Sequence, residues 1–447
     1  MGGNGLAKMR IRLYTLGCKV NQYDTQAMAE LFISAGWEIA GDGQPADAVL
    51  LNTCTVTAEA DRKCRQMLRH AAQDDPGAVM IVAGCYAMRE GEQLVRDGLA
   101  DLVIGTEGRS RVVTLIEEIM RGKALLPRDS LAIPRRGVFE PLVISSPGER
   151  TRANLKIQEG CDRFCAYCII PYVRGPIRSR DAEETLAEAQ RLAEAGAREL
   201  VLTGIHIASY GRDRDEKPEE ALLSLLKGLS VVPGIIRLRL GSLEPVLMSE
   251  RFIAGLREIS GLCPHFHLSL QSGCDATLLR MRRRYTTASF LQGLERIRQV
   301  FPEAALTTDV IVGFPGETEE EFAVSCETVR RAGFSRIHVF PYSRREGTPA
   351  AAMPGQCTRA EKKGRAAVME AIGTASSRRY MAGRLGRIFP VLTETRNNGL
   401  WEGYTPEYIR VRFTGETVAG EIVPVRLTEI CESTPDTCLG EKGVING

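Results

Sequence analysis

Short apolar runs alternate with helical patterns along most of the chain, and no other feature limits its possible folds as strongly. In the first third, the apolar runs cover 11–16, 46–51, 78–83 and 101–105, and the helical patterns cover 24–36, 57–72, 89–97 and 109–122. Buried strands that are each followed by a helix form parallel sheets with helices on both faces. The sequence therefore predicts a doubly wound parallel α/β domain over 1–133, followed by a Pro- and Arg-bearing linker over 134–150.

The alternation restarts after the linker and then gives way to a different pattern. The expected strands are 154–158, 199–204, 235–242, 265–271, 306–313 and 336–342. Six strand-helix units predict a partial (β/α)6 barrel over 151–383, with its site at the carboxyl ends of the strands. Residues 384–447 read as short strands separated by turns, which is typical of a small all-β barrel.

Composition limits the setting in which the chain works. No apolar run approaches the roughly 18 residues of a membrane span, and the first residues lack the apolar segment of a secretory signal, so we expect a cytoplasmic protein with no membrane partner. In a reducing compartment, 13 cysteines indicate metal or redox chemistry and not a disulfide framework. A net charge of only +2 means that nucleic acid would be held by local basic patches.

Three cysteines stand within eight residues directly after the first expected barrel strand. Cys161, Cys165 and Cys168, in "GCDRFCAYC", have the spacing C-x3-C-x2-C. A cubane iron-sulfur cluster has four irons that each normally take one thiolate, so three protein thiols leave one iron open. Zinc prefers a closed set of four ligands, and no nearby His completes one here. The motif therefore predicts a [4Fe-4S] cluster with a vacant position.

This motif, in this position, resembles the signature of the radical S-adenosylmethionine (SAM) enzymes. The resemblance implies that SAM binds the open iron and is cleaved by an electron from the cluster to give a radical that abstracts hydrogen. It also implies cofactor contacts on successive strands, carried over from motifs such as "LTGIH", "GSLEP" and "LSLQSG". The residues at these positions are Gly204, Glu244, Gln271, Arg283 and Asp309.

A second set of three cysteines follows three strands of the first domain. Cys18, Cys54 and Cys85 each come just after an expected strand, and the carboxyl ends of parallel strands meet at one edge of a sheet. A single cysteine at a strand end is usually a small hydrophobe, but three ahead of a radical SAM barrel predict an auxiliary cluster. The remaining cysteines show no comparable spacing and are expected to be structural or free thiols: Cys64, Cys263, Cys274, Cys326, Cys357, Cys431 and Cys438.

The whole order of domains resembles the methylthiotransferases over nearly the full chain. In that family the small C-terminal barrel is a TRAM domain that binds RNA. The resemblance implies that an unreactive C–H becomes C–SCH3, with two [4Fe-4S] clusters and two SAM molecules per turnover. It further implies three partners: the anticodon stem-loop of a tRNA, an electron donor such as a flavodoxin or ferredoxin, and a source of sulfur.

Three branches of the family differ in substrate. "TLGCKVNQYDT" and "GCDRFCAYCIIPYVRGPIRSR" look most like the branch that acts on N6-threonylcarbamoyladenosine at position 37 of tRNA, with the isopentenyladenosine branch as the alternative. The ribosomal-protein branch usually has Pro-Lys after the first cysteine, where this chain has Lys19 and Val20. A threonylcarbamoyl group carries a carboxylate that suits a bidentate arginine, and Arg178 is the candidate.

RNA binding is expected in the last domain. In "WEGYTPEYIRVRF", Arg410 and Arg412 stand among the aromatics Trp401, Tyr404, Tyr408 and Phe413, a mixture that single-stranded RNA uses for phosphate contact and stacking. Core packing explains some of the same aromatics, and acidic residues in the same domain weaken the argument from charge. Two other classes stay open at this point: an iron-sulfur electron-transfer protein and an RNA-binding protein whose cysteines hold zinc.

Overall fold

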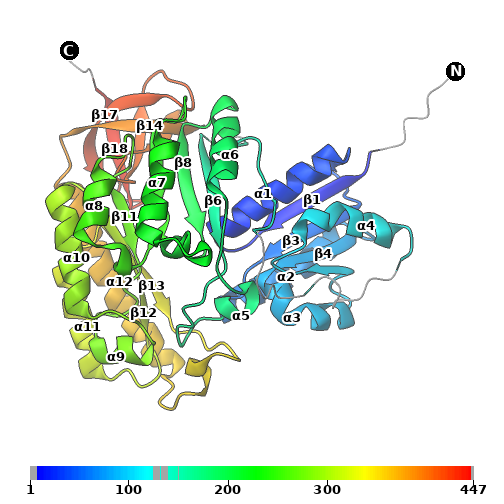
Figure 1. Cartoon of the computed structure of the whole chain (residues 1–447), viewed down its shortest axis with the longest axis horizontal. Coiled ribbons are helices and arrows are strands. Elements are labelled where there is room, and N and C mark those ends of the chain that lie inside the picture. The colour runs from blue at the N-terminus through cyan, green and yellow to red at the C-terminus, as the bar shows by residue number, and fades with distance from the viewer. Residues whose placement is uncertain (1–7, 124–130, 132–138, 149–150, 444–447) are drawn as a thin grey trace.

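The computed structural model describes residues 8–123, 131, 139–148 and 151–443, which form three units along the chain (Figure 1). The expected linker, 134–150, lies partly outside the described residues. In the described part of the chain, no helix is long and apolar enough to cross a membrane.

The first unit is a five-stranded parallel sheet with the strand order β2-β1-β3-β4-β5. Its strands are β1 (Arg10–Thr15), β2 (Glu38–Ile39), β3 (Ala48–Thr53), β4 (Val79–Gly84) and β5 (Leu102–Ile104). Its helices are α1 (Lys19–Ser34), α2 (Ala58–Asp74), α3 (Cys85–Arg96) and α4 (Val112–Met120). Apolar side chains of α1 and α4 cover one face of the sheet and those of α2 and α3 cover the other, so the doubly wound fold expected from the apolar runs is confirmed.

The second unit is a partial barrel built from two sheets whose strands are parallel, except that the short β7 pairs antiparallel with β6. The sheets have the orders β7-β6-β8-β9 and β10-β11-β12-β13 and are joined by a parallel bridge between Leu238 and Leu262. The main strands are β6 (Arg152–Glu159), β8 (Glu199–Gly204), β9 (Arg237–Leu240), β11 (His265–Leu268), β12 (Ala305–Val312) and β13 (Arg336–Pro341). These are the six strands expected from the sequence, and β7 (Arg178–Ser179) and β10 (Ser242–Leu243) are short additions.

Helices surround this barrel on its outer side (Figure 1). They are α6 (Ala182–Glu194), α7 (Pro218–Ser230), α8 (Glu250–Arg257), α9 (Asp275–Arg280), α10 (Thr287–Val300), α11 (Glu319–Ala332) and α12 (Arg359–Ala382). The short α5 (Ile170–Arg174) lies instead at the carboxyl end of the barrel, against α3 of the first domain (Figure 1). Thr286, Thr318 and Thr358 begin three of them with capping boxes, which satisfy the free N–H groups of the first turn.

The third unit is a closed barrel of five strands in the order β14-β15-β16-β18-β17. The strands are β14 (Ile388–Asn397), β15 (Leu400–Tyr404), β16 (Arg410–Thr414), β17 (Ile422–Ile430) and β18 (Thr437–Lys442). Its interior is packed with Val391, Val411, Phe413, Val425 and Leu427. The small all-β barrel expected from the sequence is therefore confirmed.

The third unit covers the amino-terminal end of the partial barrel, opposite the end that carries α5 (Figure 1). Glu199, the first residue of β8, is fully buried and accepts a hydrogen bond from Arg239 Nε at 2.6 Å. The Arg239 guanidinium lies 4.5 Å from the ring centroid of Tyr408, and the Arg152 guanidinium lies 4.3 Å from that of Tyr404. Buried charges are tolerated only when they are paired, so these contacts define one docking position.

We expect Arg239→Met to lower the free energy of unfolding by about 3 kcal/mol, because it leaves the buried Glu199 carboxylate without its nearest partner. Urea unfolding followed by circular dichroism measures the change. Arg330→Met, which removes one member of an exposed ion pair with Glu327, is the control and should change stability by less than about 0.5 kcal/mol. A loss for Arg239→Met no larger than that of the control would contradict this account of the interface.

Candidate active site

The loop with the C-x3-C-x2-C motif leaves the carboxyl end of β6 through a glycine that no other residue can replace. Gly160 has φ +71°, and a Cβ there would lie 1.8 Å from the carbonyl oxygen of Pro176. Cys165 is buried and Cys161 and Cys168 are half-buried. Burial raises the pKa of Cys161 to about 11, and burial together with the charge of Cys165 raises that of Cys168 to about 12. The three thiols therefore lie close enough to influence one another.

Glu244 is the centre of a set of charged groups beside this loop. Its carboxylate accepts contacts from Arg163 at 3.0 Å, His206 Nε2 at 3.1 Å and Arg283 at 2.9 Å. Burial opposes ionisation, but the hydrogen bond and charge of His206 and the charges of Arg283 and Arg163 lower the pKa of Glu244 to about 2. Arg283 also donates to Cys165 Sγ at 3.2 Å. Two of the expected cofactor residues thus lie against the thiol loop.

The other three expected cofactor residues make contacts with other parts of the barrel. Gly204 ends β8, where a Cβ would meet the Gln158 backbone at 3.0 Å. Gln271 has φ +66° and its N–H donates to the carbonyl of Asp309 at 2.9 Å. The Asp309 carboxylate lies 3.2 Å from His267 Nε2. The contacts of Gln271 and Asp309 therefore join them to each other and to the barrel interior, and they remain predicted cofactor contacts.

The second set of cysteines gathers at the carboxyl edge of the first sheet. Cys18 precedes α1, Cys54 follows β3 and Cys85 begins α3. A Cβ on Gly17 would lie 2.7 Å from Cys54 Cβ, so only glycine allows the first loop to pass this close to the second. Burial, followed by the charges of Cys85 and Cys18, raises the pKa of Cys54 to about 12. The three thiols are therefore neighbours, although they are far apart in sequence.

The donor chemistry of both sets suits a cluster better than a single ion. Among the residues that the structure describes, no group of three His, Cys, Asp or Glu side chains is arranged to hold one metal ion. A cubane cluster does not need such convergence, because each thiolate binds a different iron. Cys64 lies close to the second set, but its Sγ donates to the carbonyl of Cys54 at 3.5 Å and it packs in the core of the first sheet. Three thiols at each site therefore suit a cluster with one open iron better than a closed zinc site.

Arg174 joins the two sets of cysteines. It ends α5, six residues after Cys168, and is fully buried. Its Nε donates to Cys85 Sγ at 3.0 Å, and its Nη atoms donate to Glu159 at 2.8 Å and to Asn21 Oδ1 at 2.5 Å. The segment that carries the first thiol set therefore also supplies a cation to the second. Sequence reasoning missed this role, although Arg174 stands in the quoted "PYVRG".

Arg178, the candidate for a substrate carboxylate, lies on β7 and is buried. Its Nε and Nη1 atoms are also buried, and neither has a hydrogen-bond partner among the described residues. Burial lowers the pKa of Arg178, while the nearby charges of Glu159 and Glu107 oppose that shift. Buried donors without partners are rare in folded proteins, and they suit a ligand that brings an acceptor.

The expected RNA-stacking aromatics of the last domain pack against other parts of the protein. Trp401 and Phe413 belong to the core of the small barrel. Tyr404 and Tyr408 stack on each other at 5.0 Å and pack against arginines of the partial barrel. For Trp401 and Phe413 the expectation of RNA stacking is therefore wrong, because the small barrel buries both side chains. Tyr404 and Tyr408 are half-buried at the contact with the partial barrel.

Arg410 and Arg412 share one acidic partner. Glu402, on the adjacent strand, lies 2.6 Å from Arg410 Nη2 and 3.2 Å from Arg412 Nε. Both guanidinium groups are about one-third exposed, so they remain predicted RNA contacts whose charge is partly compensated. The cysteines outside the two sets are free thiols, namely Cys64, Cys263, Cys274, Cys326, Cys357, Cys431 and Cys438.

Comparisons with known proteins agree with this arrangement. Residues 10–105 match the profile described as uncharacterized protein family UPF0004, and residues 155–329 match the radical SAM superfamily. The chain is 39% identical to threonylcarbamoyladenosine tRNA methylthiotransferase MtaB of Bacillus subtilis, covering 93% of each chain. It is 34% identical to the protein of that name from Thermotoga maritima, covering 96% of each.

A relative with a different name and a solved structure complete the comparison. The chain is 36% identical to tRNA-2-methylthio-N(6)-dimethylallyladenosine synthase of Syntrophotalea carbinolica, covering 93% of this chain and 96% of that one. The radical SAM methyltransferase TsrM from Kitasatospora setae superposes with a TM-score of 0.56 over 77% of this chain and 74% of that one. At 14% identity, this likeness concerns the fold alone.

We expect Arg174→Met to lower the reduction potential of a cluster held by Cys18, Cys54 and Cys85, because a cation beside the thiolates favours the added electron. Redox titration followed by electron paramagnetic resonance, after anaerobic reconstitution, measures the potentials of both clusters. Arg174→Lys keeps the charge and should shift the potential less. Arg191→Met, at an exposed position of α6, is the control. Equal potentials in Arg174→Met and the control would contradict the assigned contact.

Proposed function

The chain belongs to the radical SAM tRNA methylthiotransferases, and on that premise we propose that it converts N6-threonylcarbamoyladenosine at position 37 of tRNA to its 2-methylthio derivative. The observation that carries the choice of substrate is the buried guanidinium of Arg178, whose two unpartnered N–H groups suit the threonyl carboxylate. The relatives named for this substrate include the B. subtilis protein at 39% identity. The proposal places the enzyme in the cytoplasm with its tRNA.

Membership of the family implies SAM and [4Fe-4S] chemistry, and we propose one cluster on each set of three cysteines. Cys161, Cys165 and Cys168 would hold the cluster that binds SAM, and Cys18, Cys54 and Cys85 would hold the auxiliary one. When bound, these groups supply the radical that activates the C2–H bond and the sulfur that replaces its hydrogen. General-base chemistry cannot do this, because that carbon is not acidic.

The chain's own residues position these groups. Glu244 stays ionised at neutral pH and, with Arg283, presents paired charges to the amino and carboxylate groups of SAM. Gly204, Gln271 and Asp309 are the further proposed contacts for SAM. Arg174 holds Cys85 in place from the barrel side, so the two cluster sites keep a fixed separation.

The proposal includes the partners that such a reaction needs. The tRNA anticodon stem-loop is the substrate, and Arg410 and Arg412 are proposed contacts for it at a distance from the thiols. An electron donor such as a flavodoxin or ferredoxin must reduce the SAM-binding cluster, and a sulfur source must renew the transferred sulfur. Two SAM molecules per turnover supply the methyl group and the radical.

Mass spectrometry of tRNA nucleosides from a strain without this gene tests the proposed substrate. We expect 2-methylthio-N6-threonylcarbamoyladenosine to disappear and its precursor without the methylthio group to accumulate. The second candidate function is the dimethylallyl (isopentenyl) branch, which the 36% identical S. carbinolica relative favours. Loss of the 2-methylthio dimethylallyl nucleoside in place of the threonylcarbamoyl one would establish that alternative and overturn our proposal.

We expect Arg178→Gln to lower kcat/KM for a threonylcarbamoyl stem-loop by about 30-fold or more, because a buried charge pair to the substrate is lost. Turnover of the same RNA with the threonyl carboxylate esterified should fall by less than about threefold, since the ester never makes that pair. Arg191→Gln is the matched control. Equal losses on the two RNAs would remove Arg178 from substrate recognition.

A further inference from the structure

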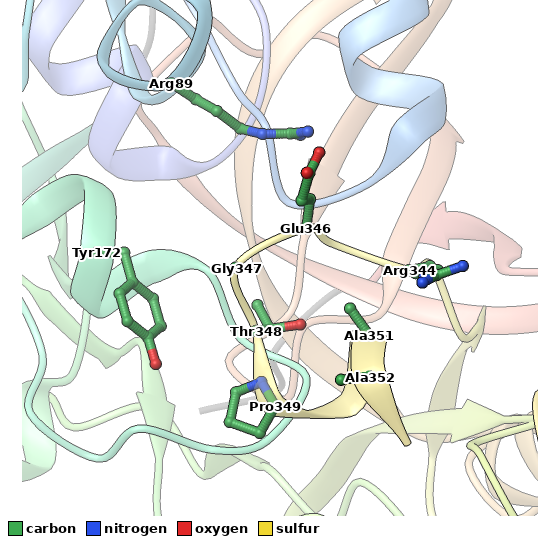
Figure 2. A pocket seen from close by; sticks show the side chains of 9 residues that line it. All are labelled: Arg89, Tyr172, Arg344, Glu346, Gly347, Thr348, Pro349, Ala351 and Ala352. Carbon is green, nitrogen blue, oxygen red and sulfur yellow. The ribbon is translucent and has the colours of Figure 1, made fainter. Parts of the chain in front are cut away.

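A pocket of about 800 Å³ opens where three segments of the chain meet (Figure 2). Arg89 of α3, Tyr172 of α5 and the 344–352 segment after β13 line it. In Figure 2, Arg89 and Glu346 extend toward each other, and Tyr172 and Arg344 lie on opposite sides of the 347–349 turn. The pocket thus offers an aromatic ring, two cations and a carboxylate, which is a mixture suited to a polar ring system with a phosphate nearby.

The residues that line this pocket are close in sequence to the two sets of cysteines. Tyr172 follows Cys168 by four residues, and Arg89 follows Cys85 by four. The third wall is fixed by Arg345, which donates to the carbonyl of Thr55 at 3.2 Å, directly after Cys54. A molecule bound in the pocket is therefore held beside both cluster sites.

Asp61 forms ion pairs with the arginines of two of these walls. It accepts from Arg89 at 2.9 Å and from Arg345 at 2.6 Å. The Arg89 and Arg345 side chains are 20% and 5% exposed, so the pair forms a partly buried floor and not a loose surface contact. By contrast, Arg344 is exposed and has no ion-pair partner among the described residues, so its charge is available to a ligand.

Two residues of α5 differ in their surroundings. Arg174 is fully buried and points to Cys85, whereas Tyr172 is 38% exposed and lines the pocket. The pocket therefore lies on the outer side of this helix, away from the buried thiol contact. It is suited to a part of the substrate that adjoins the reacting group and not to the reacting group itself.

A second exposed aromatic extends this outer surface. Phe164, within the C-x3-C-x2-C loop, is 45% exposed and lies 5.6 Å from the Tyr172 ring in an edge-to-face arrangement. Its φ is +48°, which is an outlier for a bulky residue. Residues with strained backbone angles are common at ligand-binding sites, where the surrounding structure holds them in that conformation. Here the loop that carries the first set of cysteines places an exposed aromatic ring beside that of Tyr172.

A basic helix face leads away from the pocket. The N–H of Ala58, the first residue of α2, donates to Ser343 Oγ at 2.9 Å, so this helix starts at the pocket wall. Its 17 residues span about 24 Å. A hollow of about 540 Å³ runs along one face, lined by Arg62, Arg65, Gln66, Arg69, His70 and Gln73. Arg69 is exposed and has no ion-pair partner among the described residues, and this face suits a chain of phosphates.

We propose that this pocket binds the loop nucleotide adjoining the modified one, with its base stacked on Tyr172 and in contact with Phe164, and with the stem phosphates lying along α2. An enzyme that acts on a base must take it out of the stack, which leaves the neighbouring base without its stacking partner. Aromatic side chains replace that partner in single-stranded RNA recognition. This inference rests on the proposed function, since it takes an RNA loop as the substrate.

The test uses the full chain, reconstituted anaerobically, and a threonylcarbamoyl stem-loop with 2-aminopurine at a position adjoining the modified nucleotide. Stacking quenches the fluorescence of 2-aminopurine, so the wild type should bind the RNA and quench the probe. Tyr172→Ala should weaken binding about tenfold and abolish quenching, because base-aromatic stacking is lost. Tyr172→Phe keeps the ring and should match the wild type within about twofold. Tyr172→Ala with unchanged affinity and full quenching would overturn the inference.

The basic face of α2 has its own readout in the same assay. Arg69→Gln should weaken binding of all stem-loops alike and reduce the slope of log K against log salt by about one, as the loss of a phosphate contact does. Arg330→Gln, on the exposed side of α11, is the matched control and should leave the slope unchanged. An Arg69→Gln slope equal to that of the control would remove α2 from the proposed site.

The outcomes separate this inference from the proposed function. Cluster absorbance equal to that of the wild type confirms that Tyr172→Ala folds and carries its iron. If the wild type binds and modifies the stem-loop while Tyr172→Ala behaves identically, the pocket assignment fails and the proposed function stands. If the wild type binds no stem-loop, both fail together.

Discussion

A buried network of charges determines how the first domain docks on the partial barrel, and the arrangement of the two sets of cysteines depends on that docking. Asp24 of α1 pairs with Lys156 of β6 at 2.7 Å and with the fully buried Arg109. Glu159, at the end of β6, pairs with Lys156 at 2.6 Å and with Arg174 at 2.8 Å. Burial opposes the charge of Glu159, but the four cations around it, Arg174, Lys156, Arg109 and Arg178, lower its pKa well below the ordinary value. Each charge is tolerated there only because the others are present.

This constraint fixes how the two sets of cysteines, which belong to different domains, lie relative to each other. The domains dock in the single arrangement that satisfies all these groups, and that arrangement places Arg174 on Cys85. A second charged network, at Glu199 and Arg239, positions the small barrel at the other end of the strands. The Cys161, Cys165 and Cys168 loop therefore lies at one end of the partial barrel, and the third domain docks at the other.

The sequence allowed much of the fold to be predicted, because buried parallel strands are nearly continuous apolar runs. Every residue of β3 is buried, so its sequence is mostly apolar and could be recognised as a strand. β2, β7 and β10 have two residues each, too few to show any pattern. The helix after Cys18 starts at Lys19 and not at the expected residue 24. Its first turns contain the polar residues Asn21 and Asp24, which are buried by partners on the barrel. Buried polar residues interrupt the apolar pattern by which a helix is recognised in a sequence.

The site was predicted where local spacing carries chemistry and missed where distant partners do. The C-x3-C-x2-C loop is a short-range pattern, whereas the contact of Arg174 with Cys85 spans 89 residues and leaves no local pattern. The aromatic group near Trp401 misled the interpretation for the same reason: composition does not tell whether Tyr408 meets RNA or Arg239.

The proposed function requires two open cubane clusters, one on each set of cysteines, and the contact of Arg174 with Cys85 fixes how the two sets lie relative to each other. The most direct test is to count iron and acid-labile sulfide in the reconstituted protein and to record electron paramagnetic resonance with both sites reduced. The account predicts about eight of each per chain and a spectrum split by coupling between the two clusters, which collapses to one uncoupled signal when Cys18, Cys54 and Cys85 are replaced. Four or fewer irons per chain, or two clusters without coupling, would contradict it.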